Sequence, residues 1–420
     1  MKTITPRLVP ALAALALALA LAAPAHAEQA PAAPVPAAPG EWRLGPSLDG
    51  RLRTELVRQD GLSADSVTLR LRPGLTAESP FGLSLLVEGE GTLALGSAYN
   101  AYPFAVLSSQ RRVQYALVAD PETLELNRLQ LQYRSSALTV TLGRQRIVMD
   151  DARLVGNAGW RQNEQTFDAL RAEAKLGPLS LDLAYATSQR TIFGRDAGER
   201  MAYDGRLVFL NAGVTAGPVR LKTFAYLLDY DAKEQIGGQA AQLADAATLG
   251  LRANAAFKLP GNAKLDLAAI WASQSSWADN PADYRVDYLF AEACLSLGKL
   301  SVTAGGERLG SDGVHAFQRP AANQPRFDQY IITPAAGLSD TWAGLSYRVT
   351  GVPLAGTAIA SVTAHRFAAA ASDQSYGTGI EAALALPLGR ATLLFKVSDF
   401  DGTVPGTSWT KFWLQADFAL

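Results

Sequence analysis

The sequence has only one cysteine, Cys294, in 420 residues. A single thiol cannot form an intrachain disulfide, so the fold must be stabilised by other interactions. Only three histidines are present, and His26, His315 and His365 have no cysteine or second histidine at metal-ligand spacing. We therefore expect no transition-metal site and no cofactor.

Strong net charge and enzyme motifs are also missing. The formal net charge is −1 at pH 7, which argues against nucleic acid as a partner. The sequence has no Gly-x-Ser-x-Gly motif, phosphate-binding loop or dinucleotide fingerprint. The chain is therefore not expected to be an enzyme.

Long hydrophobic runs are confined to the N-terminus. Lys2 and Arg7 precede the apolar run 8–23, which is followed by Ala25-His26-Ala27. This order is typical of a secretory signal peptide over residues 1–27, with a retained anchor as the alternative. Residues 28–42 are rich in Ala and Pro and predict a flexible segment. No later run reaches 18 apolar residues, so transmembrane helices are not expected.

The rest of the chain alternates between apolar and polar residues. Leu138, Val140 and Leu142, for example, share one side of an extended segment, with threonines between them. About 18 such segments have the length of tilted membrane strands. We place them at 48–58, 64–73, 81–94, 124–134, 137–147, 166–176, 179–190, 203–215, 219–230, 246–259, 264–275, 284–297, 300–309, 341–350, 356–367, 378–387, 390–399 and 409–420.

The gaps between these segments follow a rule. They are short after even-numbered segments, as at 135–136 and 177–178, and most are long after odd-numbered ones, as at 95–123, 148–165 and 310–340. Outer-membrane barrels have short periplasmic turns and long extracellular loops. The sequence therefore predicts an all-β fold, a transmembrane antiparallel β-barrel of about 18 strands over residues 43–420, in the cell outer membrane.

The last segment, 409–420, supports this prediction because Phe412, Leu414, Ala416, Phe418 and Leu420 fall on one face. It resembles the C-terminal assembly signal of outer-membrane barrels, although those usually end in Phe. We expect outer-membrane lipids and the barrel assembly machinery as partners. We also favour a monomer.

One stretch resembles a known family. The run GRQRIVMDDARLVGNAGWRQNEQTFDALR is similar to the signature of the alginate-export family of bacterial outer-membrane porins at 143–145 and 155–168. The resemblance implies an 18-stranded barrel with an electropositive pore, without fixing the substrate. Its motif loop contains Gly156, Asn157, Gly159, Trp160, Gln162, Asn163, Glu164 and, at the start of the next strand, Asp168.

Alternation predicts which charged residues face the pore, because they occupy the side opposite to the apolar face. Some of these cations could instead pair with neighbouring carboxylates or reach the headgroups. Those near the periplasmic strand ends would form a basic vestibule that attracts anions. The candidate pore-lining residues, including loop arginines, are Arg51, Arg53, Arg70, Arg72, Arg128, Arg134, Arg144, Arg146, Arg161, Arg171, Glu173, Arg220, Lys222 and Arg252.

The motif loop has two interpretations. It either folds inward and narrows the pore, with Arg144 and Arg161 lining it, or stays on the surface, held by hydrogen bonds of its own Asn157, Asn163 and Asp168. The resemblance favours the inward loop. The loops 95–123 and 310–340 are alternative lids because they are unusually long.

Aromatic residues near strand ends, including Tyr133, Tyr185, Trp271, Tyr347 and Trp409, are typical of interfacial girdles. Some aromatics could instead face the pore as platforms for sugars. Trp413 falls on the pore side by alternation.

Several functions stay open. The first is a channel for anionic saccharides, with alginate-like export implied by the resemblance. The alternatives are an uptake porin for small carboxylates and a barrel whose loops mediate binding or adhesion. Outer-membrane lipases and proteases are the enzyme alternative, which a hydrolysis screen would test.

Overall fold

The computed structural model describes residues 41–232, 235–236, 239–321, 327, 329–330 and 332–420. The predicted signal peptide (1–27) and most of the Ala/Pro-rich segment (28–42) lie outside the described residues. Within the part of the chain that is described, no helix is long and apolar enough to cross a membrane.

Eighteen strands form the wall, and every predicted segment corresponds to one of them. Their ends differ from the predicted ends by a few residues. The wall strands are β1 (Arg43–Gln59), β2 (Leu62–Glu78), β3 (Leu83–Ala98), β4 (Thr123–Arg134), β5 (Leu138–Gln145), β6 (Thr166–Leu176), β7 (Leu179–Arg190), β8 (Ala202–Ala216), β9 (Val219–Tyr230), β12 (Ala246–Leu259), β13 (Ala263–Ser276), β14 (Arg285–Leu297), β15 (Leu300–Leu309), β16 (Leu338–Val352), β17 (Gly356–Ala368), β18 (Ser375–Leu388), β19 (Ala391–Gly402) and β20 (Trp409–Ala419).

Small elements occupy the connections. A small hairpin, with two residues in each strand, lies between β9 and β12. Three short 3₁₀ turns also lie outside the wall. They are β10 (Gln235–Ile236), β11 (Gln239–Ala240), η1 (Arg195–Met201), η2 (Ala241–Ala244) and η3 (Pro260–Asn262).

Each wall strand pairs antiparallel with its neighbours in the chain, and β1 also pairs with β20. Arg53 stands opposite Gln415 at this seam. The pairing leaves the cylinder without an open edge, as a strand structure in a membrane requires. The predicted 18-stranded antiparallel barrel is confirmed.

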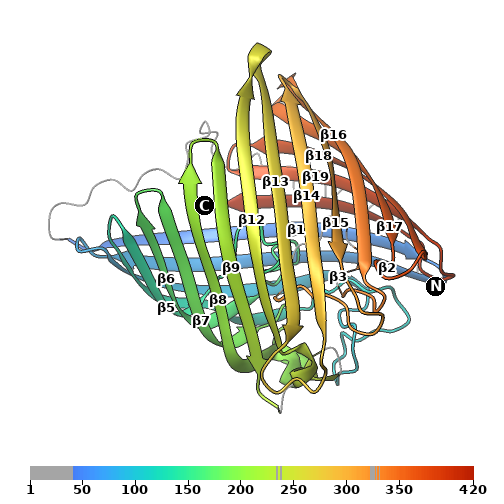
Figure 1. The fold of residues 1–420 in the computed structure, drawn as a ribbon, viewed down its shortest axis with the longest axis horizontal. Helices are drawn as coiled ribbons and strands as arrows, with labels where there is room; N and C mark the ends of the chain where they lie inside the picture. The colour runs from blue at the N-terminus through green and yellow to red at the C-terminus, as the bar shows by residue number, and fades with distance from the viewer. Residues whose placement is uncertain (1–40, 233–234, 237–238, 322–326, 328, 331) are drawn as a thin grey trace.

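The connections differ between the two ends of the barrel. The turns at one end are short, for example at 177–178 and 217–218, whereas the other end has the long connections 99–122, 146–165 and 310–337. In Figure 1 the β12–β13 turn projects at the top, and the long loops gather at the bottom. We call these the short-turn end and the long-loop end.

The two faces of the wall have different side chains. Leu124, Leu142 and Leu170 are each about half exposed or more, as expected for side chains that face lipid. The residues between them point inward, where Thr141 and Ala169 are buried. Buried aromatic and aliphatic residues therefore lie inside the barrel, beneath the loops that enter it.

Trp409 was predicted to belong to the interfacial girdle, but its side chain faces the interior of the barrel. Tyr133, Tyr185, Trp271 and Tyr347 are exposed on the outer face, but Trp409 is only 6% exposed. It packs inside the barrel against Phe327 of the β15–β16 loop, with ring centroids 5.3 Å apart. The girdle assignment of Trp409 was therefore wrong.

Candidate functional site

The β5–β6 loop (146–165) crosses the interior of the barrel. Its first arm, 146–155, contacts the wall formed by β8, β9, β12, β14 and β15. Its second arm, 156–165, contacts β1, β2, β3 and the neighbouring β20. The motif loop therefore lies within the lumen, between opposite sides of the wall.

Charged residues anchor the first arm. Arg252 on β12 donates two hydrogen bonds, of 2.8 and 3.0 Å, to the carboxylate of Asp151, and Lys222 on β9 pairs with Asp150. The pKa of Asp151 is lowered, because the guanidinium group of Arg252 outweighs the opposing effect of burial. Lys222 and Arg252 were predicted to line the pore, and they hold this loop.

The deepest anchor of the first arm is Arg153. Its Nε donates to Oε2 of Glu307 on β15 at 3.0 Å and to the hydroxyl of Tyr288 at 3.2 Å. Arg319 of the β15–β16 loop donates to the other oxygen of Glu307, also at 3.0 Å. The three charged side chains are at most 4% exposed. A buried carboxylate shared by two guanidinium groups fixes two loops to one point of the wall.

Backbone carbonyls of the second arm are held by arginines of the wall. Nη1 of Arg51 donates to the carbonyl oxygens of Gly159, Trp160 and Arg161 at 3.0–3.2 Å. Arg53 donates to the Trp160 carbonyl as well. Because both arginines belong to β1, this arm is bound directly beside the seam with β20.

Glu164 is the most highly connected residue of the motif. Its carboxylate accepts hydrogen bonds from Arg146, Asn127 and Asn157 at distances between 2.5 and 2.7 Å, and Arg72 lies 3.7 Å away. Burial opposes its ionisation, but Arg72 and Arg146 lower the pKa of Glu164 to about 2. The carboxylate therefore stays charged and holds the loop at neutral pH.

The amides of the motif bind the wall and a second loop. Thr92 on β3 donates to the Asn163 side chain at 2.6 Å. The Gln162 side chain donates to Thr68 on β2 at 2.7 Å, and its backbone NH donates to Asp120 of the β3–β4 loop at 2.8 Å. These side chains are at most 3% exposed, so they secure the loop.

Trp160 lies at the centre of an aromatic and cationic cluster. Its ring makes an edge contact with Trp413 on β20, with centroids 5.7 Å apart. The guanidinium carbon of Arg53 lies 4.4 Å from the centroid of Trp160, and Nζ of Lys396 lies 4.5 Å from it. These distances are typical of cation–π interactions.

Three residues of the β5–β6 loop have positive φ angles, which residues other than glycine rarely adopt. Asp150, Ala152 and Ala158 have φ values of 55°, 59° and 51°. None is glycine, and such angles are uncommon for alanine. The loop conformation therefore depends on its contacts with the wall.

Most predicted pore residues are engaged in ion pairs. Their carboxylate partners lie on the same strand, on neighbouring strands or in the loops, so these arginines have a structural role in addition to any role in the pore. The pairs are Arg51–Asp417, Arg53–Asp120, Arg70–Asp49, Arg72–Glu90, Arg128–Glu88, Arg146–Glu164, Arg161–Glu55, and Arg171 with both Glu173 and Asp182.

Arg144 does not line the pore. It alternates with the outward-facing Leu142, and its guanidinium group donates two hydrogen bonds of 2.8 Å to Asp168. Asp168 alternates with the outward-facing Leu170. The pair therefore lies on the outer face, and the predictions of a pore-lining Arg144 and of Asp168 as a hydrogen-bonding residue of the loop were wrong.

Four inward-facing cations lie at the short-turn end. Among the described residues, no carboxylate is within ion-pair distance of Arg134, Lys175, Arg220 or Lys258, and all four are exposed. Lys299, Arg348 and Arg390 lie at the same end and are exposed too. We call the first four residues the basic rim. The rim could attract anions because its charge is not neutralised locally.

Sequence reasoning missed several residues that build the constriction. Asp120, Glu307 and Phe327 come from a loop, a strand and a second loop, and only the path of the chain brings them into the lumen. Glu307 was detectable as an acidic residue on the inner face of its strand. In the described part of the chain, no group of three or more His, Cys, Asp or Glu residues could hold a metal ion.

A family model described as "Gram-negative porin" matches residues 11–420 of the chain. The chain belongs to the Gram-negative porin family. The porin is therefore an outer-membrane channel and not an enzyme. A comparison with curated proteins found no match.

Solved structures with the same fold include several from Pseudomonas aeruginosa. OpdK is 12% identical to the porin, with 90% of this chain and 99% of that chain covered and a TM-score of 0.65. OpdK with vanillate is 13% identical, with 89% and 98% covered and a TM-score of 0.67. OccK2 (OpdF) in complex with glucuronate is 14% identical, with 90% and 98% covered and a TM-score of 0.68. At these identities the likeness shows the fold alone.

The comparisons match the broader part of the sequence prediction. They identify a porin and do not single out the alginate-export family. The resemblance of the run 143–168 to the alginate-export family therefore does not fix the substrate of this porin.

Proposed function

We propose that this porin is a diffusion channel for small anionic solutes, with small carboxylates as the substrate class. The observation that carries the proposal is the basic rim of Arg134, Lys175, Arg220 and Lys258. Elsewhere in the lumen most cations are neutralised by carboxylates. Cations without such partners raise the local concentration of anions and disfavour the entry of cations.

The interior of the barrel supports a small solute. The β5–β6 loop is fixed to opposite sides of the lumen, where Arg153 binds Glu307 on β15 and Glu164 binds Asn127 on β4. It is also joined to the β15–β16 loop by hydrogen bonds between Gly156 and Ala321 and between Ala321 and Leu154. A passage narrowed by two connected loops favours small acids over bulky polymers.

The proteins of similar fold are consistent with this class. OpdK has been solved with vanillate and OccK2 (OpdF) with glucuronate, and both ligands carry one carboxylate. Arginine suits such groups because its planar guanidinium can donate two parallel hydrogen bonds and stays charged.

Export of alginate-like uronates is the second candidate, because the motif loop resembles that of the alginate-export family. However, Gln162, Asn163 and Glu164 are buried and hydrogen-bonded to the barrel or to other loop residues. The motif therefore accounts for how the loop is held, and it leaves few free groups to recognise a uronate.

Reversal potentials in planar bilayers under a salt gradient test the proposal. We expect anion selectivity, and clear cation selectivity would overturn it. Vanillate and glucuronate should reduce the ion current at lower concentration than oligouronates. The opposite order would favour uronate export, and a closed lumen would favour a binding or adhesion barrel.

A further inference from the structure

The outer face of the barrel has a trough across β12, β13, β14 and β15. Four small residues face outward in register: Ala253 pairs with Ala269, Ala269 with Ala291, and Ala291 with Gly306. Because none extends beyond a methyl group, the wall is hollowed along this row. The depression has a volume of about 780 Å³, and an adjoining one of about 640 Å³ continues it. We call this row the trough.

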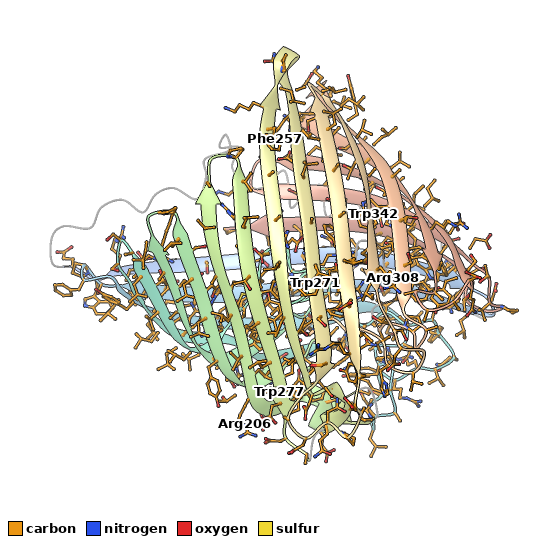
Figure 2. The ribbon with its side chains drawn as sticks, viewed as in Figure 1. Arg206, Phe257, Trp271, Trp277, Arg308 and Trp342 are labelled. Atoms are coloured by element: carbon orange, nitrogen blue, oxygen red, sulfur yellow. The ribbon has the colours of Figure 1, made fainter. Side chains whose placement is uncertain are left out.

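Large apolar side chains form both banks of the trough. On the long-loop side, Leu251, Trp271 and Leu289 are 47–55% exposed, and they stand opposite one another on adjacent strands. On the short-turn side, the outward-facing Leu267 of β13 is 38% exposed and borders the adjoining depression. Figure 2 places Trp271 and Arg308 on the front wall of the barrel. Such a channel is suited to a flexible hydrocarbon chain.

Basic residues lie at one end of the trough. Gly306 is paired with Thr341 on β16, which is paired with Arg366 on β17. Arg308 is two residues from Gly306 on the same outward side, and it borders the depression together with Ser339 and Thr341. Among the described residues, no carboxylate is within ion-pair distance of Arg308 or Arg366, and both are exposed.

An arginine on a lipid-facing wall is costly unless its charge reaches the headgroup level. Both arginines lie toward the long-loop ends of their strands, so they reach the outer leaflet. Guanidinium groups bind phosphate with two parallel hydrogen bonds. Since strands of such barrels are tilted by about 35–45°, a row across them runs obliquely to the membrane normal, from the headgroups towards the apolar core.

We propose that the trough binds one acyl chain of a phosphorylated lipid of the outer leaflet, lipid A, whose phosphate is held by Arg308 and Arg366. The hydroxyl groups of Ser339 and Thr341 lie between the two strands that carry the arginines and add hydrogen-bond donors. The occupant is a lipid and not a second barrel, because two exposed arginines at the headgroup level complement the phosphates of an anionic lipid; Arg308 also donates a hydrogen bond of 3.0 Å to the Ala370 carbonyl. The site is independent of the proposed solute and of the lumen.

Native mass spectrometry of the intact porin in detergent, titrated with lipid A, tests the site. Arg308→Gln combined with Arg366→Gln should weaken binding by at least about tenfold, because the variant loses both guanidinium partners of the phosphate. Ala291→Leu should also weaken binding, because it fills the trough without touching the lumen. The matched controls are Arg206→Gln, an outward arginine of β8 paired with Asp229, and Ala212→Leu on the outer face of β8. Neither should change binding.

The proposal is overturned if the double variant and Ala291→Leu bind lipid A as tightly as the unmodified porin. Equal binding of lipid A with and without its phosphates would also overturn it. If the porin instead forms oligomers that Ala291→Leu dissociates while no lipid is bound, the trough is an interface between copies and the lipid assignment fails. All variants should keep the conductance of the unmodified porin, which shows that they are folded.

Discussion

Val155 of the β5–β6 loop and Ala321 of the β15–β16 loop form a parallel β-bridge inside the barrel. Gly156 donates its NH to the Ala321 carbonyl at 3.1 Å, and Ala321 donates to the Leu154 carbonyl at 3.0 Å. Two loops that begin on different sides of the wall are thereby joined across the lumen. The constriction is built from both loops.

A disulfide across this bridge should leave the channel unchanged. In a Cys294→Ser background, Val155→Cys with Ala321→Cys places two thiols on directly bridged residues, within the usual range for disulfide formation. Oxidation should cross-link the loops without altering mean conductance in planar bilayers, because they are already joined. A conductance that differs between the oxidised and reduced states would show that the loops normally separate.

Glu307→Gln should destabilise the porin more than Arg153→Gln. Loss of Glu307 leaves two buried guanidinium groups without their carboxylate, and removing one partner of a buried pair typically costs about 3–5 kcal/mol. Loss of Arg153 leaves Glu307 paired with Arg319, so its cost is smaller. The midpoint of urea unfolding in lipid vesicles measures both. The exposed Arg206→Gln is the control and should cost less than about 1 kcal/mol.

The contacts that Glu164 makes to hold the β5–β6 loop should weaken at acidic pH. The pKa of Glu164 is lowered to about 2 from an ordinary 4.5, so its ionised form stabilises the docked loop above pH 4.5. This stabilisation is lost as the pH falls from 4.5 towards 2. Current noise should be higher at pH 3 than at pH 5. Glu164→Gln should raise the noise already at pH 7, and an unchanged trace would contradict this role.

Deleting residues 156–162 should raise the single-channel conductance, because this arm crosses the lumen beside β1 and β20. The wall arginines Arg51 and Arg53 would then be solvated by pore water, so the barrel should still assemble. Trp160→Ala keeps the arm and removes one ring, and it should produce a smaller increase. If the deletion leaves conductance unaltered, the arm does not limit the passage.

Neutralising the basic rim should reduce anion selectivity. Arg134→Gln, Lys175→Gln, Arg220→Gln and Lys258→Gln together should move the reversal potential towards zero in a salt gradient. The effect should be largest at low ionic strength, since salt screens exposed charges. Replacement of the outward-facing Arg58 should have no effect. An unchanged reversal potential in the fourfold variant would exclude the rim as the selectivity element.

The wall could be predicted from the sequence because its pattern is local. Leu138, Val140 and Leu142 alternate with polar residues, and each turn is marked by a short break, so 18 strands and their facing follow from period two. The same rule would have placed Arg144 outside with Leu142, and Trp409 inside with Trp413. Family resemblance and girdle statistics were given more weight at these two positions, and both assignments failed.

The constriction could not be predicted in detail because its contacts are distant in sequence. Arg153 and Glu307 are 154 residues apart, and their pairing depends on the path of a loop with unusual φ angles. The resemblance did predict that the motif loop enters the lumen. It could not show that Glu164 would be buried among two arginines and two asparagines, since no spacing rule links residues of strands to residues of a loop.

The second arm of the β5–β6 loop binds both sides of the seam, Arg51 and Arg53 on β1 and Trp413 on β20. It therefore holds β1 and β20 together from inside the barrel, at the strand pair that connects the two ends of the described wall. This joint can form only when both the first and the final wall strands are present. Pairing of β1 with β20 and docking of the second arm would then depend on each other. A barrel in which these strands did not pair would also lack the constriction.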